Sequence, residues 1–129
     1  MPTRRHVMAL SLAACLPGLP VRAAQGPAVP LLRSTTLEGQ PFDLAALRGK
    51  VVMLVFWSTG CPVCRDKMPE LRANALGWRG QPFELVTVSV DRKQQDMADY
   101  ERLVLATVNK NQRLTALWAG DASYQDNLG

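Results

Sequence analysis

Apolar positions gather in two runs that are typical of buried strands. The first, Val51–Trp57, has seven consecutive apolar residues rich in β-branched and aromatic side chains, with Gly49 before it and Gly60 after it. Phe83–Val90 is a second run with strong strand character, and Asp91 ends it. Length and composition favour strands over buried helix segments. We therefore predict that the first run is a central strand buried on both faces.

Two segments carry the spacing of amphipathic helices. Between the strands, Pro62–Leu76 has good helix formers and apolar residues three and four positions apart, and Pro69 inside it predicts a kink. Apolar residues recur in the same way over Gln94–Lys110. Leu114–Trp118 is either a third strand or an extension of that helix. The order strand, helix, strand, helix predicts an α/β domain with parallel strand pairs.

The segment before the first apolar run predicts smaller elements. Leu31–Thr36 has the pattern of a short strand. Residues 38–40 turn the chain into Pro41–Asp43, an edge-like strand in which proline is tolerated. Asp43 is placed to cap a single helical turn that follows.

The first residues have the pattern of an export signal. Arg4 and Arg5 precede a mostly apolar stretch, Val7–Leu19, and small residues follow around Ala23. This order is typical of a cleaved secretory signal, and the stretch is short for a membrane span of about 20 residues. The predicted organisation is an export signal at residues 1–23, a linker rich in small residues at 24–30 and one domain at 31–129. We expect a protein of the periplasm or cell envelope.

Two details leave the export route open. Residues 3–8, TRRHVM, resemble a twin-arginine signal, and the alternative is the general secretory route. Residues 12–15 resemble a lipobox, in which Cys15 would carry a lipid anchor after cleavage. Otherwise Cys15 is one more apolar residue of the signal.

Removal of the signal changes the charge and the available chemistry. The whole chain has 15 Lys and Arg against 11 Asp and Glu. Three arginines and no acid leave with the signal, so the mature chain has 12 basic residues and a net charge of +1. This balance makes nucleic acid a poor partner. The only histidine, His6, leaves as well, which excludes Ser–His and Cys–His catalysis and most zinc sites.

The chemistry-bearing motif is Cys61-Pro62-Val63-Cys64, whose cysteines are the two that the mature chain keeps. A zinc site would need two further cysteine or histidine ligands, so we expect no metal. A structural disulfide that closes so small a loop removes little chain entropy. The favoured interpretation is a redox-active disulfide that needs no dissociable cofactor.

The position of the motif assigns roles to its cysteines. Sites in parallel sheets form beyond the carboxyl ends of the strands, where the motif follows Trp57. We expect Cys61 at the helix N-cap and Pro62 at the first helical position, where the missing N–H of proline costs nothing. The helix N-terminus favours the thiolate form of Cys61 at that position. Cys61 would attack a partner disulfide, and Cys64, more buried, would resolve the mixed disulfide. The expected neighbours of the site are Trp57, Thr59, Gly60, Pro62, Val63 and Lys67.

Four segments carry a family resemblance, namely Phe42–Leu44, Leu47–Trp57, Cys61–Arg65 and Met68–Leu71. Through them, about sixty residues from Leu31 to Val90 resemble the TlpA-like branch of the thioredoxin superfamily. The resemblance implies a thioredoxin-like fold and a thiol–disulfide oxidoreductase of exported proteins, reducing in direction, as in cytochrome c maturation. It also implies protein disulfides as substrates and a membrane-bound dithiol as electron donor.

The sequence departs from that family at three places. Val55 stands where thioredoxins proper have an aspartate that helps deprotonate the buried cysteine. Lys67 stands where this branch often has a glutamate; it either faces the thiols and favours a thiolate, or faces solvent. The family continues into a cis-proline, a β-hairpin and a last helix, whereas no proline follows Pro82. We therefore expect an incomplete, C-terminally truncated fold, in which residues 121–129 lead into an absent segment and Val51–Trp57 exposes apolar surface.

Two other functions stay open. A thiol-dependent peroxidase would use Thr59 near Cys61, although peroxiredoxin sites resemble a proline and a threonine at wider spacing. A non-catalytic module would bind a partner or hold copper(I) between the two thiolates. The methionines of the mature chain, Met53, Met68 and Met97, fit core or helix-face positions better than copper ligands.

Overall fold

The computed structural model describes residues 29–128, and the predicted export signal, with Arg4, Arg5 and Cys15, lies outside them. No helix within the described part is long and apolar enough to cross a membrane. In chain order the elements are β1 (Leu32–Thr35), β2 (Pro41–Asp43), η1 (Leu44–Leu47), β3 (Val51–Trp57), α1 (Pro62–Gly77), β4 (Phe83–Ser89), α2 (Gln94–Leu105), η2 (Lys110–Gln112), β5 (Thr115–Trp118) and β6 (Gln125–Asp126).

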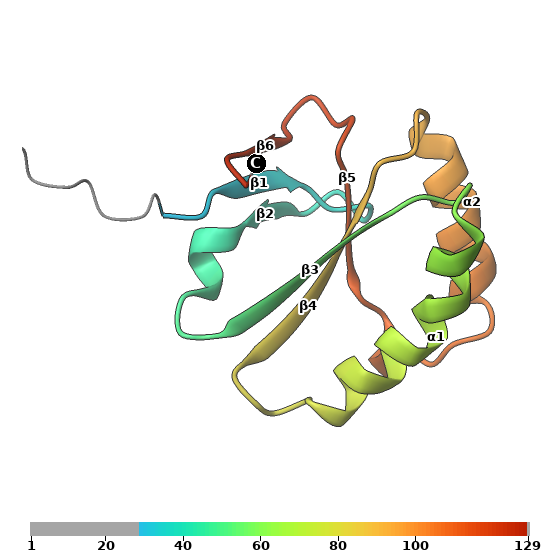
Figure 1. The fold of residues 1–129 in the computed structure, drawn as a ribbon, viewed down its shortest axis with the longest axis horizontal. Coiled ribbons are helices and arrows are strands. Elements are labelled where there is room, and N and C mark those ends of the chain that lie inside the picture. Colours follow the sequence, from blue (N-terminus) through green and yellow to red (C-terminus); the bar gives the residue numbers. More distant parts are fainter. Residues whose placement is uncertain (1–28, 129) are drawn as a thin grey trace, which may run out of the picture.

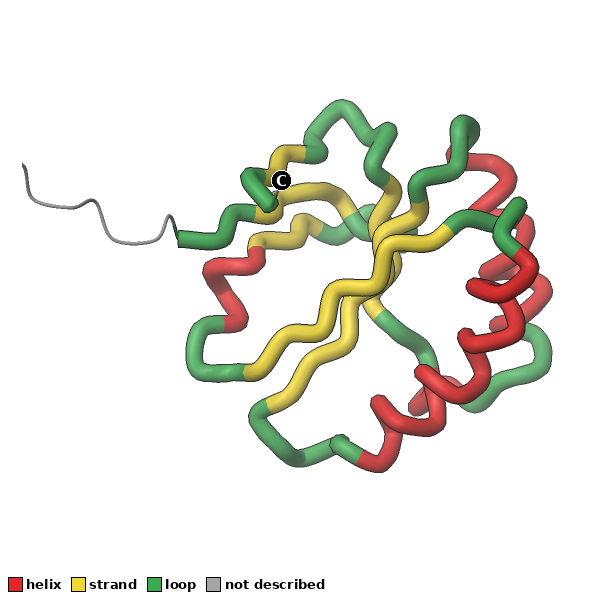
Figure 2. The backbone as a smooth tube through the Cα atoms, viewed as in Figure 1, coloured by secondary structure: helices red, strands yellow, loops and turns green. Residues whose placement is uncertain are grey.

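Two three-stranded sheets make up the fold. The larger sheet has the order β3-β4-β5, and both of its strand pairs are parallel, as the sequence predicts. The smaller sheet has the order β2-β1-β6 and is antiparallel. Figure 1 shows α1 and α2 on one side of the larger sheet and the smaller sheet on the other. The same three layers follow from the colours of Figure 2.

Alternating side chains of the larger sheet supply a core on each of its faces. Toward the smaller sheet, Val86 and Val88 of β4 pack with Leu32 and Leu117, and Leu54 of β3 joins them. Toward the helices, the buried cluster is Trp57, Met68, Met97 and Ala116. Because the sheet packs on both faces, the carboxyl ends of β3, β4 and β5 keep fixed positions relative to one another. The dithiol lies at these strand ends.

The local signals predicted most boundaries correctly. Asp43 caps η1, since its carboxylate accepts the backbone N–H of Ala45 at 2.9 Å. The segment 114–118 forms the strand β5 rather than a helical extension. α1 continues through Pro69 as one helix to Gly77. The cap and the helix follow from local patterns, whereas the sequence left β5 open between a strand and a helix extension.

The predicted helix over Gln94–Lys110 is too long, because α2 ends at Leu105. The Thr107 hydroxyl donates to the Val104 carbonyl at 2.8 Å, a local bond that competes with helical continuation. Asn109 then begins the short helix η2, and its backbone N–H donates to Gln112 Oε1 at 3.3 Å. The helical spacing of apolar residues continues beyond Leu105, so it did not predict this helix end.

The prediction that Val51–Trp57 is a central strand buried on both faces is wrong. Within residues 29–128, β3 is an edge strand that pairs with β4 alone. Val51, Met53 and Phe56 are 68%, 44% and 48% exposed. A run of apolar residues cannot distinguish a central strand from an edge strand, because strand order depends on the other strands. The exposure itself agrees with the apolar surface expected on this segment.

Part of residues 121–128 pairs with the start of the domain, a pairing that the sequence did not predict. Leu32 of β1 lies opposite Asp126 of β6. The Asn127 side chain accepts the backbone N–H of Leu31 at 2.7 Å and donates to the Val29 carbonyl at 3.0 Å. The polar composition of these residues gave no strand signal.

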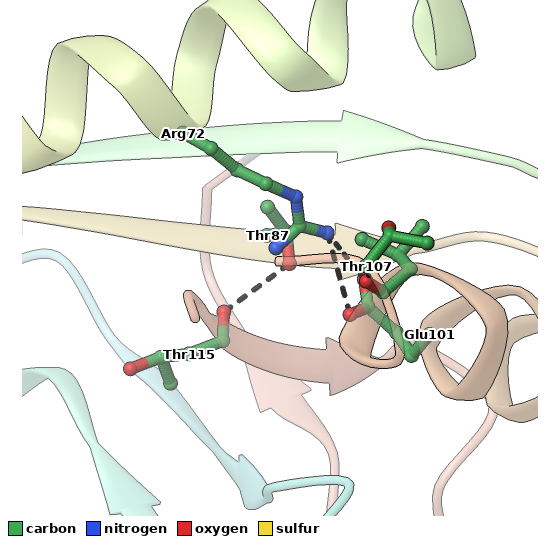
Figure 3. A network of polar contacts seen from close by, with 6 residues as sticks. Arg72, Thr87, Glu101, Thr107 and Thr115 are labelled. Carbon is green, nitrogen blue, oxygen red and sulfur yellow. Dashed lines mark hydrogen bonds and ion pairs between the residues drawn. The ribbon is translucent and has the colours of Figure 1, made fainter. Parts of the chain in front are cut away.

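A buried ion pair joins the two helices above the larger sheet. Arg72 of α1 donates through Nη2 to Glu101 of α2 at 3.1 and 3.3 Å, and their side chains are only 4% and 6% exposed. Figure 3 shows the pair above Thr87 of β4, whose hydroxyl donates to the Thr115 carbonyl. Burial raises the pKa of Glu101 above its ordinary value even with the Arg72 guanidinium beside it.

Candidate active site

The two cysteines of the motif lie where β3 gives way to α1 and form a disulfide with Cα atoms 5.2 Å apart. Cys61 is the N-cap of α1, and Pro62 occupies the first turn. The backbone N–H of Cys64 points to Cys61 Sγ at 3.2 Å. A helix N-terminus directs unpaired N–H groups and a positive potential at this sulfur, which favours its thiolate.

The disulfide lies between the core and an exposed rim. Cys64 packs against the buried cluster on the helix side of the sheet, and Cys61 is partly exposed. Gly60, Pro62 and Val63 are exposed around it. A partner can therefore reach Cys61 from solvent, and the rim it would meet there is small and apolar.

The turn before Cys61 is tied to the end of β4. The Thr59 hydroxyl donates to Asp91 Oδ1 at 2.8 Å, and the Thr59 backbone N–H donates to both carboxylate oxygens at 3.0 and 3.2 Å. The Cys61 backbone N–H donates to the Ser58 carbonyl at 3.1 Å and closes the turn. Thr59 is therefore the residue through which the dithiol loop is held.

Asp91 is itself fixed by residues at the carboxyl ends of two strands. The Ser89 hydroxyl donates to Asp91 Oδ2 at 2.7 Å and accepts the Asp91 backbone N–H at 3.1 Å. Trp118 of β5 donates its indole N–H to the Asp91 carbonyl at 2.8 Å. The carboxyl ends of the three parallel strands thus meet at one residue, Asp91, next to the dithiol.

Trp57 is buried beneath the site as a packing residue. Its ring lies 4.9 Å from that of Tyr100 between centroids, with the planes tilted by 58°. Its indole N–H has no hydrogen-bond partner within residues 29–128. Burial also raises the pKa of Tyr100. The ring supports the disulfide from the core side and presents no platform to a ligand.

Lys67 faces solvent, which is one of the two alternatives that the sequence left open. Its side chain is 65% exposed, and its ammonium donates to Glu70 at 2.9 Å. The Glu70 carboxylate raises the pKa of Lys67 and keeps it charged. Lys67 therefore forms an ion pair with a neighbour along α1 and makes no hydrogen bond to the cysteines.

Two of the three methionines considered as copper ligands belong to the core. Met68 and Met97 are buried on the helix side of the sheet, and Met53 lies half-exposed on β3. No group of three or more His, Cys, Asp or Glu side chains with metal-binding geometry occurs in the described ranges. The packing of Met68 and Met97 agrees with the interpretation given to them from the sequence.

A family model for the AhpC/TSA family matches residues 25–121, three quarters of the chain. The chain belongs to the AhpC/TSA family. The match contains the dithiol and its strand-to-helix setting. It also contains Asp91 and Trp118, so the bonded turn lies within the family segment.

Within the AhpC/TSA family, the chain is similar to proteins named as oxidoreductases. Sporulation thiol-disulfide oxidoreductase A of Bacillus subtilis is 28% identical over 102 residues, which cover 78% of this chain and 61% of that protein. The thiol-disulfide oxidoreductase ResA of Halalkalibacterium halodurans is 34% identical over 58 residues, 45% of this chain and 33% of that protein. The chain thus spans less than two thirds of these relatives.

Solved structures give the same fold. A thiol:disulfide interchange protein of the thioredoxin family from Chlorobium tepidum superposes with a TM-score of 0.61 at 24% identity, covering 74% of this chain and 62% of that one. A secreted disulfide oxidoreductase of Mycobacterium tuberculosis gives 0.55 at 29% identity, covering 67% and 59%. The family member described here therefore has a thioredoxin-like α/β fold.

Sequence reasoning placed both cysteines but missed Asp91, Ser89 and Trp118. Asp91 was interpreted only as the end of a strand. A usable signal existed, because a carboxylate directly after a buried parallel strand lies at the same sheet edge as a motif that follows the neighbouring strand. Which side chains meet at that edge depends on strand order, and the sequence leaves that order open.

Proposed function

We propose that this member of the AhpC/TSA family is a thiol–disulfide oxidoreductase acting through Cys61 and Cys64. The observation that carries the proposal is the disulfide at the N-cap of α1, beyond the carboxyl end of β3 and open to solvent at Cys61. The names of the relatives above support it. The pair itself is the redox centre, and no dissociable cofactor is needed.

The proposed reaction is two consecutive thiol–disulfide exchanges. In the reduced chain, the Cys61 thiolate attacks one sulfur of a partner disulfide, forms a mixed disulfide and releases the other partner sulfur as a thiolate. Cys64 then attacks Cys61 Sγ, restores the intramolecular disulfide and releases the second partner thiol. Two electrons pass to the partner. A donor dithiol must return them by the same exchange in reverse.

The setting of the reaction follows from the predicted signal and the family resemblance. We propose an exported protein that reduces disulfides of other exported proteins, as in cytochrome c maturation, with electrons from a membrane-bound dithiol. The mycobacterial relative named soluble secreted antigen MPT53, 50% identical over 38 residues, supports export. A lipid anchor at Cys15 stays an additional proposal.

Turnover of a disulfide substrate tests the proposal. The reduced chain should reduce insulin or a glutathione mixed disulfide. Cys61→Ser should abolish turnover, and Cys64→Ser should trap a mixed disulfide through Cys61. Absence of exchange in the wild-type chain, or a trapped adduct on Cys64 alone, would contradict the assigned roles.

A peroxidase arm separates the alternative enzyme class. The hydroxyl of Thr59 donates a hydrogen bond to Asp91 and is therefore not available as a hydrogen-bond donor to a peroxide at Cys61. We therefore expect slow consumption of an alkyl hydroperoxide relative to disulfide reduction. A faster reaction with hydroperoxide than with insulin would assign the site to a peroxidase instead.

A further inference from the structure

The carboxylate of Asp91, which follows β4, accepts hydrogen bonds from the dithiol loop. It accepts three bonds from two groups of Thr59, at 2.8 to 3.2 Å, and a fourth from Ser89. Thr59 lies 32 positions from Asp91 in the chain, so these bonds join two different strand ends. Bonds to an ionised acceptor are stronger than those between neutral groups.

The loop that this carboxylate holds ends at the nucleophile. Thr59 is the second residue of the turn that the Ser58 carbonyl and the Cys61 N–H close. Two residues on, Cys61 Sγ meets the N–H of Cys64 at 3.2 Å. Release of Thr59 frees the turn, and the turn fixes how Cys61 enters the helix. The position of the sulfur therefore depends on a contact made two residues before it.

The anchor is rigid because it is bonded on its other sides. Ser89 and Trp118 hold the Asp91 side chain, N–H and carbonyl. Ser89 is fully buried, and Trp118 packs against the buried cluster beneath the dithiol. Movement of Asp91 as a whole would disturb the carboxyl ends of β4 and β5 together, because Ser89 bonds its carboxylate and Trp118 bonds its backbone carbonyl. Such a support restrains the loop more than a surface hydrogen bond would.

We propose that Asp91 is a positioning residue of the dithiol, acting through Thr59 to keep Cys61 at the helix N-cap in the reduced chain. The inference rests on the proposed oxidoreductase function and adds a residue to its machinery. Exchange requires the attacking sulfur to approach the partner disulfide in line, so a mobile Cys61 lowers the rate of attack. It also loses the N–H that stabilises its thiolate.

Thr59→Val is the sharpest test, because it removes one donor and leaves every charge in place. We expect roughly a tenfold fall in kcat for insulin reduction with KM nearly unchanged. The pH midpoint of iodoacetamide alkylation of reduced Cys61 should move upward. Thr59→Ser keeps the hydroxyl and should restore both values. Asp91→Ala, which removes all the bonds to the carboxylate, should lower kcat further.

Asp66→Asn is the matched control, since Asp66 is an exposed carboxylate two residues after Cys64 with no hydrogen bond to residues 29–128. It should leave kcat and the alkylation midpoint within about twofold of wild type. If Asp66→Asn lowers kcat as much as Asp91→Ala does, charge alone is responsible and the positioning role fails.

Wild-type kinetics in a folded Thr59→Val chain, shown by an unchanged melting temperature, also overturn the inference while the oxidoreductase stands. If the wild-type chain reduces no disulfide, the proposed function fails. The alkylation midpoints then still decide whether Asp91 holds Cys61.

Discussion

At the scale of single side chains, burial and one neighbouring carboxylate determine the pKa of Tyr124. Partial burial and the Asp126 carboxylate raise the pKa of Tyr124 to about 12, from an ordinary 10.0. The folded chain thus disfavours tyrosinate. This contribution to stability is complete below the unfolded pKa and is lost as the pH rises through about 12.

We expect a late tyrosinate transition in an ultraviolet absorbance titration of the folded chain, and Tyr124→Phe should reduce its amplitude and leave the contribution of Tyr100, whose pKa is also raised. Unfolding by denaturant should show a shallower loss of stability above the ordinary pKa in the variant. A Tyr124 that ionises like free tyrosine while the chain is folded would contradict the assignment.

The single residues that the sequence predicted correctly are those whose partners are close along the chain. Asp43 caps η1 through Ala45, and Cys61 caps α1 beside Cys64. Asp91 could not be assigned in this way, because its partner Thr59 belongs to another strand end. Lys67 shows the same limit, since either exposure or contact with the thiols fitted its sequence position.

Between elements, the buried ion pair is the main polar link of α1 to α2. Glu101→Gln would leave the Arg72 guanidinium buried without a counter-charge, so we expect a loss of about 3–5 kcal/mol in the free energy of unfolding. Denaturant unfolding measures this loss. The double variant Arg72→Met, Glu101→Leu should recover most of it, because apolar side chains of similar volume replace both charges.

The control for this pair is Glu70→Gln, which removes an exposed partner of Lys67 on the same helix. Exposed pairs are screened by solvent, so the stability should hardly change. Equal losses for Glu101→Gln and Glu70→Gln would show that burial gives the Arg72 pair no special weight.

The sequence predicted where helices and strands lie along the chain better than it predicted which of them lie next to one another in space. Apolar runs and helical spacing located β3, β4 and α1, since these signals depend on the local chain. The apolar spacing did not locate the end of α2, where Thr107 donates its hydroxyl to the Val104 carbonyl just beyond the helix. β6 has two exposed residues and exists only because β1 lies opposite them. Such a strand has no alternation of apolar and polar residues from which it could be predicted.

At the scale of the whole described domain, residues 29–128, the open edge of β3 exposes the apolar side chains of Val51, Met53 and Phe56. A groove of about 630 Å³ adjoins it on the helix side, where Val51, Met53 and Trp78 contribute. A second of about 400 Å³ adjoins it on the other face, beside Val52 and Leu54. An unpaired strand edge with apolar flanks is a template for association between chains.

We therefore expect the chain to self-associate in a concentration-dependent way, and Val51→Lys to reduce it, since a charge on an edge strand opposes pairing. Sedimentation velocity measures the association. Leu103→Lys is a matched control, because Leu103 of α2 is 69% exposed against 68% for Val51 but lies away from the edge. A similar effect of both changes would assign the association to general apolar exposure.

The pairing of β1 with β6 has a consequence for the timing of folding. Leu31 and Asn127 are bonded although 96 positions separate them, whereas β3 and β4 pair across a single helix. Contacts between distant residues form later than local ones, because a longer loop must close. During synthesis, β3, α1 and β4 all leave the ribosome before Asn127 does. We expect the cysteines to reach their helix cap while the antiparallel sheet is still unfinished.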